Sequence, residues 1–94
     1  MYIVAQFHAK PDCEDLLSQA LLAMMEPTRA EPGCIEIHVY HALRDPSTFF
    51  IHSAWTNEEA FEIHATWPHT AAFLSQLPGL IDHELQAVRC ARLA

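Results

Sequence analysis

Alternating apolar and polar side chains predict strands in three segments of this chain. The segments are residues 2–9, 34–41 and 49–55. In the second segment Ile35, Ile37 and Val39 share one face, which we expect to be the buried one, and polar side chains share the other. A weaker pattern predicts a last strand over residues 80–92.

Apolar side chains at helical spacing predict a helix that opens at Pro11-Asp12. Its apolar stripe consists of Leu16, Leu17, Ala20, Leu21 and Met24. Pro27 is expected to bend or end this helix, and Pro32-Gly33 is expected to end it.

Two shorter helices are predicted after the third strand. Thr56 and Glu59 have the spacing of a capping box, with Thr56 as the N-cap. Pro68 then begins a second short helix, which Pro78 and Gly79 end.

The element order β-α-β-β-α-β predicts a single α+β domain over residues 1–94 with the ferredoxin-like arrangement. Its four antiparallel strands carry the helices on one face, which leaves the other face of the sheet uncovered. Of the 94 residues, 51% are hydrophobic, which is rich for so short a chain. We therefore expect a second copy to cover that face in a homodimer, closing two sheets against each other.

Charge and cysteine content narrow the classes of partner and compartment. The formal net charge is −7 with five Lys and Arg in all, so neither nucleic acid nor an anionic membrane is expected as a partner. Cys13, Cys34 and Cys90 are odd in number and form no CxxC pair, which is typical of a cytoplasmic protein. Neither a signal peptide nor a membrane-spanning apolar run is predicted.

Seven histidines, more than Lys and Arg together, suggest acid–base chemistry. Strand alternation places His38 and Tyr40 on one face, and His52 is expected to lie opposite one of them on the neighbouring strand. With Gln6 or His8 from the first strand, these side chains would form a polar patch on an apolar floor. Such a composition is typical of a small-molecule pocket.

Sequence motifs for metals and nucleotide cofactors are absent. The chain contains no HxH, HxxxH or HExxH spacing and no glycine fingerprint for flavin, nicotinamide or nucleotide. We therefore expect no cofactor and no metal. A metal site would have to be assembled from residues that are distant in sequence.

A series of short motifs resembles the antibiotic biosynthesis monooxygenase superfamily, including its quinol monooxygenase-like members. The motifs are Lys10-Pro11, Thr28 to Cys34, Asp45-Pro46, Trp55, Ala60 to His64, and Pro68-His69 to Phe73. The resemblance covers nearly the whole chain and implies a dimeric α/β barrel of ferredoxin-like subunits. It also implies a cofactor-independent monooxygenase that oxidises a quinol or polyphenolic small molecule with dioxygen.

The candidate site combines motif histidines with strand residues. The candidate bases are His64, His38 and His52, any of which would deprotonate a phenol so that it reduces dioxygen itself. The residues expected to bind the substrate are Gln6, His8, Tyr40, Phe49, Ser53, Trp55 and His69. Ser53 stands where many relatives carry a glutamate, so an acid or base at that position is absent.

Other functions remain open at this point. The superfamily also contains haem-degrading enzymes and isomerases, so the motifs are specific for the fold and not for the reaction. The same histidines would serve a cofactor-free isomerase of a small carbonyl compound. A non-catalytic dimeric module for small-molecule binding or stress is a third function, and haem binding is a fourth.

Overall fold

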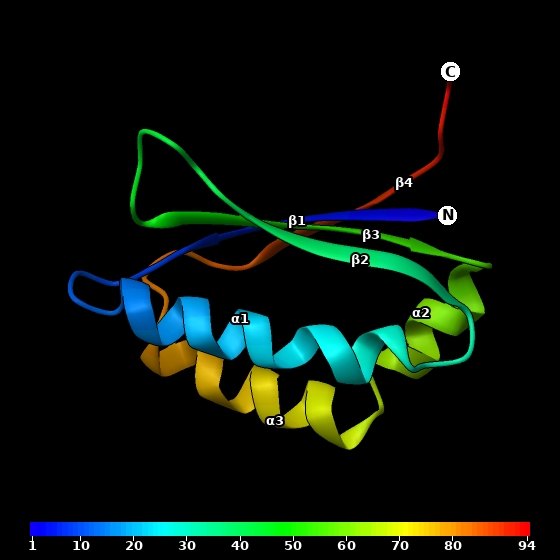
Figure 1. The fold of residues 1–94 in the computed structure, drawn as a ribbon, viewed down its shortest axis with the longest axis horizontal. Helices are drawn as coiled ribbons and strands as arrows, with labels where there is room; N and C mark the ends of the chain where they lie inside the picture. Colours follow the sequence, from blue (N-terminus) through cyan, green and yellow to red (C-terminus); the bar gives the residue numbers. More distant parts are fainter.

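The computed structural model describes residues 1–94 as one antiparallel sheet with all helices on one of its faces (Figure 1). The strands are β1 (Tyr2–His8), β2 (Cys34–His41), β3 (Thr48–Trp55) and β4 (Gln86–Cys90), in the order β2-β3-β1-β4. The helices are α1 (Glu14–Arg29), α2 (Glu58–His64) and α3 (Pro68–Gln76), followed by the short 3₁₀ turn η1 (Leu77–Gly79). The α+β, ferredoxin-like prediction is confirmed. No helix is both long and apolar enough to cross a membrane.

The core lies between the sheet and the helices. On the two central strands, Ile3 pairs with Ser53 and Ala5 pairs with Ile51, so alternate side chains of both strands face the helices. The main cluster of buried apolar residues consists of Ala5, Phe7, Ala9, Leu17, Leu21, Met24, Met25, Ile37, Phe49, Ile51, Phe73 and Leu77. Burial of each large apolar side chain contributes about 1.5–3 kcal/mol. This packing sets the distance between the sheet and the helices, and therefore the space available to a site between them.

A β-bulge at the start of β2 corrects the prediction that Ile35 faces the core. Cys34 pairs with Trp55 and Glu36 pairs with the adjacent Ala54, so Ile35 is the extra residue of the bulge. Its side chain is 64% exposed, whereas Ile37 beyond the bulge is buried as predicted. The extra residue shifts the alternation by one position, which turns Cys34 toward the core.

The helix boundaries differ from the prediction at three points. α1 begins at Glu14 and not at Pro11-Asp12, because Asp12 has a left-handed φ of +68° that a helix does not accommodate. Asn57, not Thr56, is the N-cap of α2, and its side-chain Oδ1 accepts the backbone N–H of Ala60 at 2.9 Å. Pro27 lies inside α1, which continues to Arg29. The helix persists because Thr28 is fully buried and the N–H of Ala30 still bonds the carbonyl of Glu26.

The last strand is shorter than the predicted range of 80–92. Pro78 and Gly79 close η1, and a single bridge then joins Ala9 to Ile81. Regular pairing with β1 resumes only at Gln86, after the irregular segment 82–85. In Figure 1 the C-terminal end leaves the sheet on the side opposite the helices.

Candidate functional site

An apolar cavity of about 140 Å³ lies between the sheet and the helices. Twelve of its fifteen lining residues are hydrophobic, and they come from all four strands and from α1, α2 and α3. The polar exceptions are Ser53, His64 and Thr70. The cavity therefore offers an apolar space with a few polar groups, the usual composition of a small-molecule site.

A buried carboxylate joins two histidines beside this cavity. Oε2 of Glu31 lies 2.7 Å from Nδ1 of His64 and 2.7 Å from Nε2 of His69. The Glu31 side chain is 2% exposed, and those of His64 and His69 are 11% and 20% exposed. Hydrogen bonds to a buried carboxylate are strong, and breaking such a pair leaves a charge without its partner.

Two connections, the turn after α1 and the short link between α2 and α3, bring these side chains together. Glu31 follows α1 and precedes Gly33, whose φ of +90° is a conformation that favours glycine. His64 ends α2, and the chain reverses within three residues because Thr66 and Trp67 donate backbone N–H groups to carbonyls of that last helical turn. Pro68 then begins α3, so that His69 points back to the same carboxylate.

The hydrogen bonds define which nitrogen of His64 is free. An ionised carboxylate only accepts hydrogen bonds, so Nδ1 of His64 carries the proton that Glu31 accepts. In the neutral imidazole this leaves Nε2 with a lone pair, the tautomer of a general base. Thr70 Oγ1 lies 3.3 Å from Nδ1 and further limits rotation of the ring.

Trp55 and Ser53 support the site from the sheet. Trp55 is 1% exposed, and its indole Nε1–H donates to Ser53 Oγ at 2.9 Å. The indole lies against the imidazole of His64, with ring centroids 4.8 Å apart. Ser53 lines the cavity as expected. Trp55 does not line it, and its indole instead packs against the imidazole of His64. Serine suits this position because its hydroxyl is the acceptor that a buried indole N–H requires.

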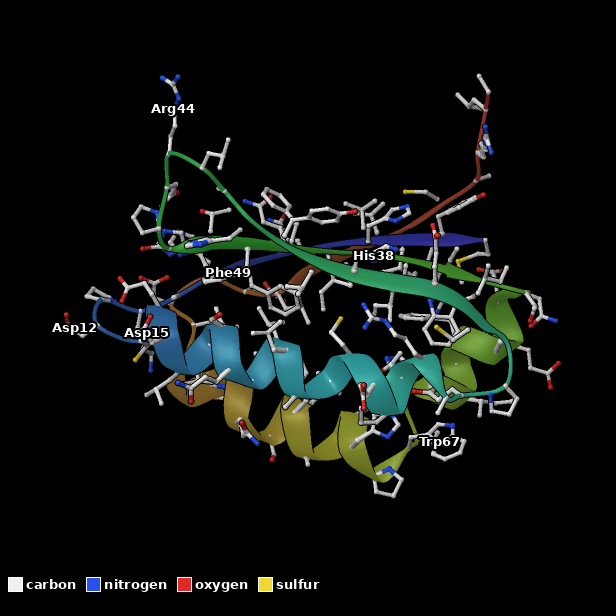
Figure 2. The ribbon with its side chains drawn as sticks, in the orientation of Figure 1. Asp12, Asp15, His38, Arg44, Phe49 and Trp67 are labelled. Carbon is white, nitrogen blue, oxygen red and sulfur yellow. The ribbon has the colours of Figure 1, made fainter.

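The other predicted site residues do not line the cavity. Phe49 is buried in the core and stacks on His41 (Figure 2 labels Phe49 beneath the sheet). His8 lies at the end of β1, where its Nδ1 is 2.6 Å from Asp82. Figure 2 also shows Arg44 at the tip of the β2–β3 hairpin, far from the helices.

The strand cluster forms on the opposite face of the sheet. His38 pairs directly with His52, which is one of the two pairings expected from the sequence. Nε2 of His38 lies 3.8 Å from Oε2 of Glu36, and Nδ1 of His52 lies 3.9 Å from Oε1 of the same carboxylate. Tyr40 and Gln6 share this face and are exposed. The sheet therefore separates His38 and His52 from His64, and the sequence-based expectation of one joint site is corrected to two separate clusters.

Sequence reasoning missed two residues of this site, Thr70, which follows His69 in the chain, and the more distant Glu31. Glu31 lies 33 residues from His64 and 38 from His69, so no local spacing connects them. The sequence does show a carboxylate immediately before Pro32-Gly33. The same pattern is also typical of an ordinary exposed turn, so it does not by itself indicate a buried site residue.

The same three side chains are also able to hold a metal ion. One ligand atom from each of Glu31, His64 and His69 lies within 4.8 Å of the others. Two histidines and one carboxylate are the set that non-haem Fe(II) oxygenases use. A candidate metal site assembled from residues distant in sequence is therefore present. In this structure the two imidazole nitrogens share the Glu31 carboxylate as their hydrogen-bond acceptor.

Cys34 lies near this carboxylate, and we expect it to be unreactive. Burial, followed by the negative charge of Glu31, raises the pKa of the Cys34 thiol. Because the thiolate is the nucleophile, iodoacetamide at pH 7.5 should modify Cys34 more slowly than Cys13 or Cys90. Peptide mass spectrometry at timed quenches measures the three rates. Modification of Cys34 first would contradict the burial and charge described here.

This chain is similar to known proteins in both sequence and fold. The model of the family described as antibiotic biosynthesis monooxygenase matches residues 1–76. The structure of Rv0793 from Mycobacterium tuberculosis is similar, with a TM-score of 0.93 and 27% identity over 99% of this chain and 94% of that chain. PA3566 from Pseudomonas aeruginosa has a TM-score of 0.93 and 26% identity, covering 99% and 93%.

A curated relative is similar in sequence as well. The uncharacterised protein sll1783 from Synechocystis is 27% identical over 79 residues, which is 84% of this chain and 54% of that protein. The chain thus spans about half the length of that relative. A solved structure described as an antibiotic biosynthesis monooxygenase has a TM-score of 0.92 at 22% identity, a likeness that shows the fold alone.

Proposed function

Because this chain belongs to the antibiotic biosynthesis monooxygenase family, we propose that it is a cofactor-independent monooxygenase that oxidises a quinol or related polyphenol with dioxygen. The observation that carries the proposal is the His64 imidazole, which lines an apolar cavity while Glu31 accepts its Nδ1–H. For this oxidation the protein has to supply a base in an apolar cavity. The base forms the phenolate, which is electron-rich enough to reduce dioxygen directly.

The cavity volume narrows the substrate class. About 140 Å³ is close to the roughly 150 Å³ of an apolar cavity that accommodates benzene. A single-ring quinol therefore matches the space as it stands, whereas a two-ring quinol requires the helices to move apart. Ser53 and Thr70 are the hydroxyl groups available to orient its oxygens.

The reaction is balanced without an external reductant. Nε2 of His64 takes the proton of a quinol hydroxyl, and Glu31 stabilises the imidazolium that results. The anion transfers electrons to dioxygen, and a C–O bond then forms at the ring. One oxygen atom stays in the product and the other leaves as water, so benzene-1,4-diol plus O₂ gives hydroxy-1,4-benzoquinone plus H₂O. Apolar walls keep competing water away from the intermediate.

A ring-size series tests this function. Oxygen uptake above the rate of autoxidation should be fastest with single-ring quinols and slower with naphthalene diols. Turnover of a carbonyl substrate under strict anaerobiosis would instead identify an isomerase. Binding without turnover would identify a small-molecule-binding module, and neither result is compatible with the proposed monooxygenase.

A metal-dependent oxygenase is the second candidate, and the Glu31, His64 and His69 set favours it. Chelator-treated protein distinguishes the two. Activity that persists after metal removal supports the cofactor-independent reaction, whereas activity that Fe(II) alone restores supports the metal-dependent one.

The proposal includes a homodimer joined through the open face of the sheet. That face has no helix over it (Figure 1), and Val4 and Val88, which pair across β1 and β4, are both exposed on it. Tyr40 on β2 is exposed on the same face, so large apolar side chains from three strands are available to a partner there. A cytoplasmic location, in which Cys13, Cys34 and Cys90 stay free, is part of the same proposal.

Replacing Val4 with Glu is therefore expected to convert the dimer to a monomer. The new charge would be buried without a partner in the interface. Light scattering should give twice the chain mass of 10.6 kDa for the wild type and the single mass for the variant. Leu22→Glu on the exposed side of α1 is the matched control and should remain dimeric. A monomeric wild type at micromolar concentration would contradict the interface.

A further inference from the structure

A second histidine–carboxylate cluster lies at the end of β1, outside the proposed catalytic site. Oδ1 of Asp82 is 2.6 Å from Nδ1 of His8 and 2.6 Å from Nδ1 of His83. The two imidazole rings are 4.2 Å apart between centroids. His8 and Asp82 are separated by 74 residues, so the fold and not the local sequence assembles the cluster.

The backbone holds the two contributing segments together independently of these side chains. The N–H of Asp82 donates to the carbonyl of His8 at 3.2 Å, and the N–H of Lys10 donates to Leu80 at 2.8 Å. Between them, Ala9 and Ile81 form an antiparallel bridge. The three side chains thus project from a backbone that is already paired, which lowers the entropy cost of joining them through a ligand.

We propose that His8, Asp82 and His83 form a surface binding site for a divalent transition-metal ion of the Zn²⁺ type. Each offers one donor atom, and the three atoms lie within 4.8 Å of one another. Imidazole nitrogen and carboxylate oxygen are ligands that Zn²⁺ takes at about 2.0–2.2 Å, with water filling the remaining position. The ion takes the place of the two N–H protons that now converge on a single carboxylate oxygen, and each neutral imidazole then carries its proton on Nε2.

The geometry requires only a small rearrangement. Two ligand atoms in a tetrahedral Zn²⁺ site lie about 3.3 Å apart, given the usual bond lengths. The two Nδ1 atoms now lie 2.6 Å from Oδ1, so each has to move away from it by up to about 0.7 Å. The side chains are free to do so because those of His8, Asp82 and His83 are 31%, 34% and 66% exposed. The nearest cationic side chain along the chain, Lys10, is directed to the carbonyl of Pro78.

Metal binding at this position would hold the edge of the sheet at β4 to the central strand β1. The segment 82–85 has no regular structure and leads into β4, which pairs only with β1. An ion that links His8 on β1 to Asp82 and His83 ties this segment to the central strand. Because the unfolded chain lacks the site, binding should stabilise the folded protein.

The test uses the full chain without a polyhistidine tag. Calorimetric titration with Zn²⁺, and Co²⁺ absorption as a spectroscopic readout, should show one equivalent that Asp82→Asn and His83→Gln each weaken by at least about 10-fold. Zn²⁺ should raise the Tm of the wild type and leave that of Asp82→Asn unchanged. His83 is mostly exposed, so its variant is expected to fold.

Three controls separate this site from other sources of binding. Glu84→Gln and His41→Gln remove a neighbouring carboxylate and an exposed imidazole, and both should bind like the wild type. His69→Gln removes a donor of the buried cluster and should also retain this equivalent. Binding that survives in Asp82→Asn and His83→Gln, or that is lost only in His69→Gln, would overturn the proposal.

Discussion

Glu31→Gln is expected to lower the rate of oxygen uptake with a quinol by roughly 10²- to 10⁴-fold, the range that a positioned general base contributes. The substitution keeps the size of the side chain but removes the charge that stabilises the His64 imidazolium. It also replaces one acceptor oxygen by an NH₂ group, which favours the wrong imidazole tautomer. The substrate affinity should change far less than the rate, because Glu31 does not line the cavity.

The matched control for this variant is Glu59→Gln, which removes an exposed carboxylate from the first turn of α2. Stopped-flow or electrode measurements of oxygen consumption, together with circular dichroism, separate loss of chemistry from loss of fold. A folded Glu31→Gln variant with a rate within twofold of the wild type would remove Glu31 from the mechanism.

Gly33→Ala is expected to destabilise the protein by about 2–5 kcal/mol. The left-handed conformation at φ +90° costs a residue with a Cβ roughly 1–2 kcal/mol. The added Cβ would also stand 2.7 Å from Cβ of Ala60 and 3.0 Å from Oγ1 of Thr56, and overpacking of this kind costs about 1–3 kcal/mol. Relief requires α2 to move, and α2 carries His64.

Urea unfolding measures this loss, and Gly79→Ala supplies the comparison. No atom lies within 4 Å of a Cβ built on Gly79, so its variant should differ from the wild type by no more than about 1 kcal/mol. Equal stabilities for the two alanine variants would show that the turn before β2 is not as tight as described.

Most elements of the fold were predictable because local patterns and tertiary packing agree. The alternation in β1 and β3 and the restart at Pro68 occur where the sequence predicts them. Leu17, Leu21 and Met24 of the predicted α1 stripe are buried, whereas Leu16 is 55% exposed. The error at Ile35 has a specific cause. A bulge adds one residue to a strand and shifts the alternation, so Cys34 faces inward and Ile35 does not. Because Ile35 is apolar, its residue type gave no sign of this shift.

The site was less predictable because its parts are joined only by the tertiary structure. His64 and His69 were identified from motifs, but the acceptor that connects them, Glu31, comes from a different turn. His38 and His52 were placed correctly on one face, yet sequence alternation does not tell which face of a sheet meets the helices and which encloses a cavity. That distinction depends on how the helices pack.

Oxygen consumption by metal-free protein tests the central claim most directly, namely that His64 acts as the base of a cofactor-independent oxidation. Chelator-treated wild type should consume oxygen with a single-ring quinol well above autoxidation, and His64→Gln should lose roughly 10²–10⁴-fold of that rate while remaining folded. Equal rates for the two proteins, or a wild type no faster than autoxidation until a metal is added, would contradict the account.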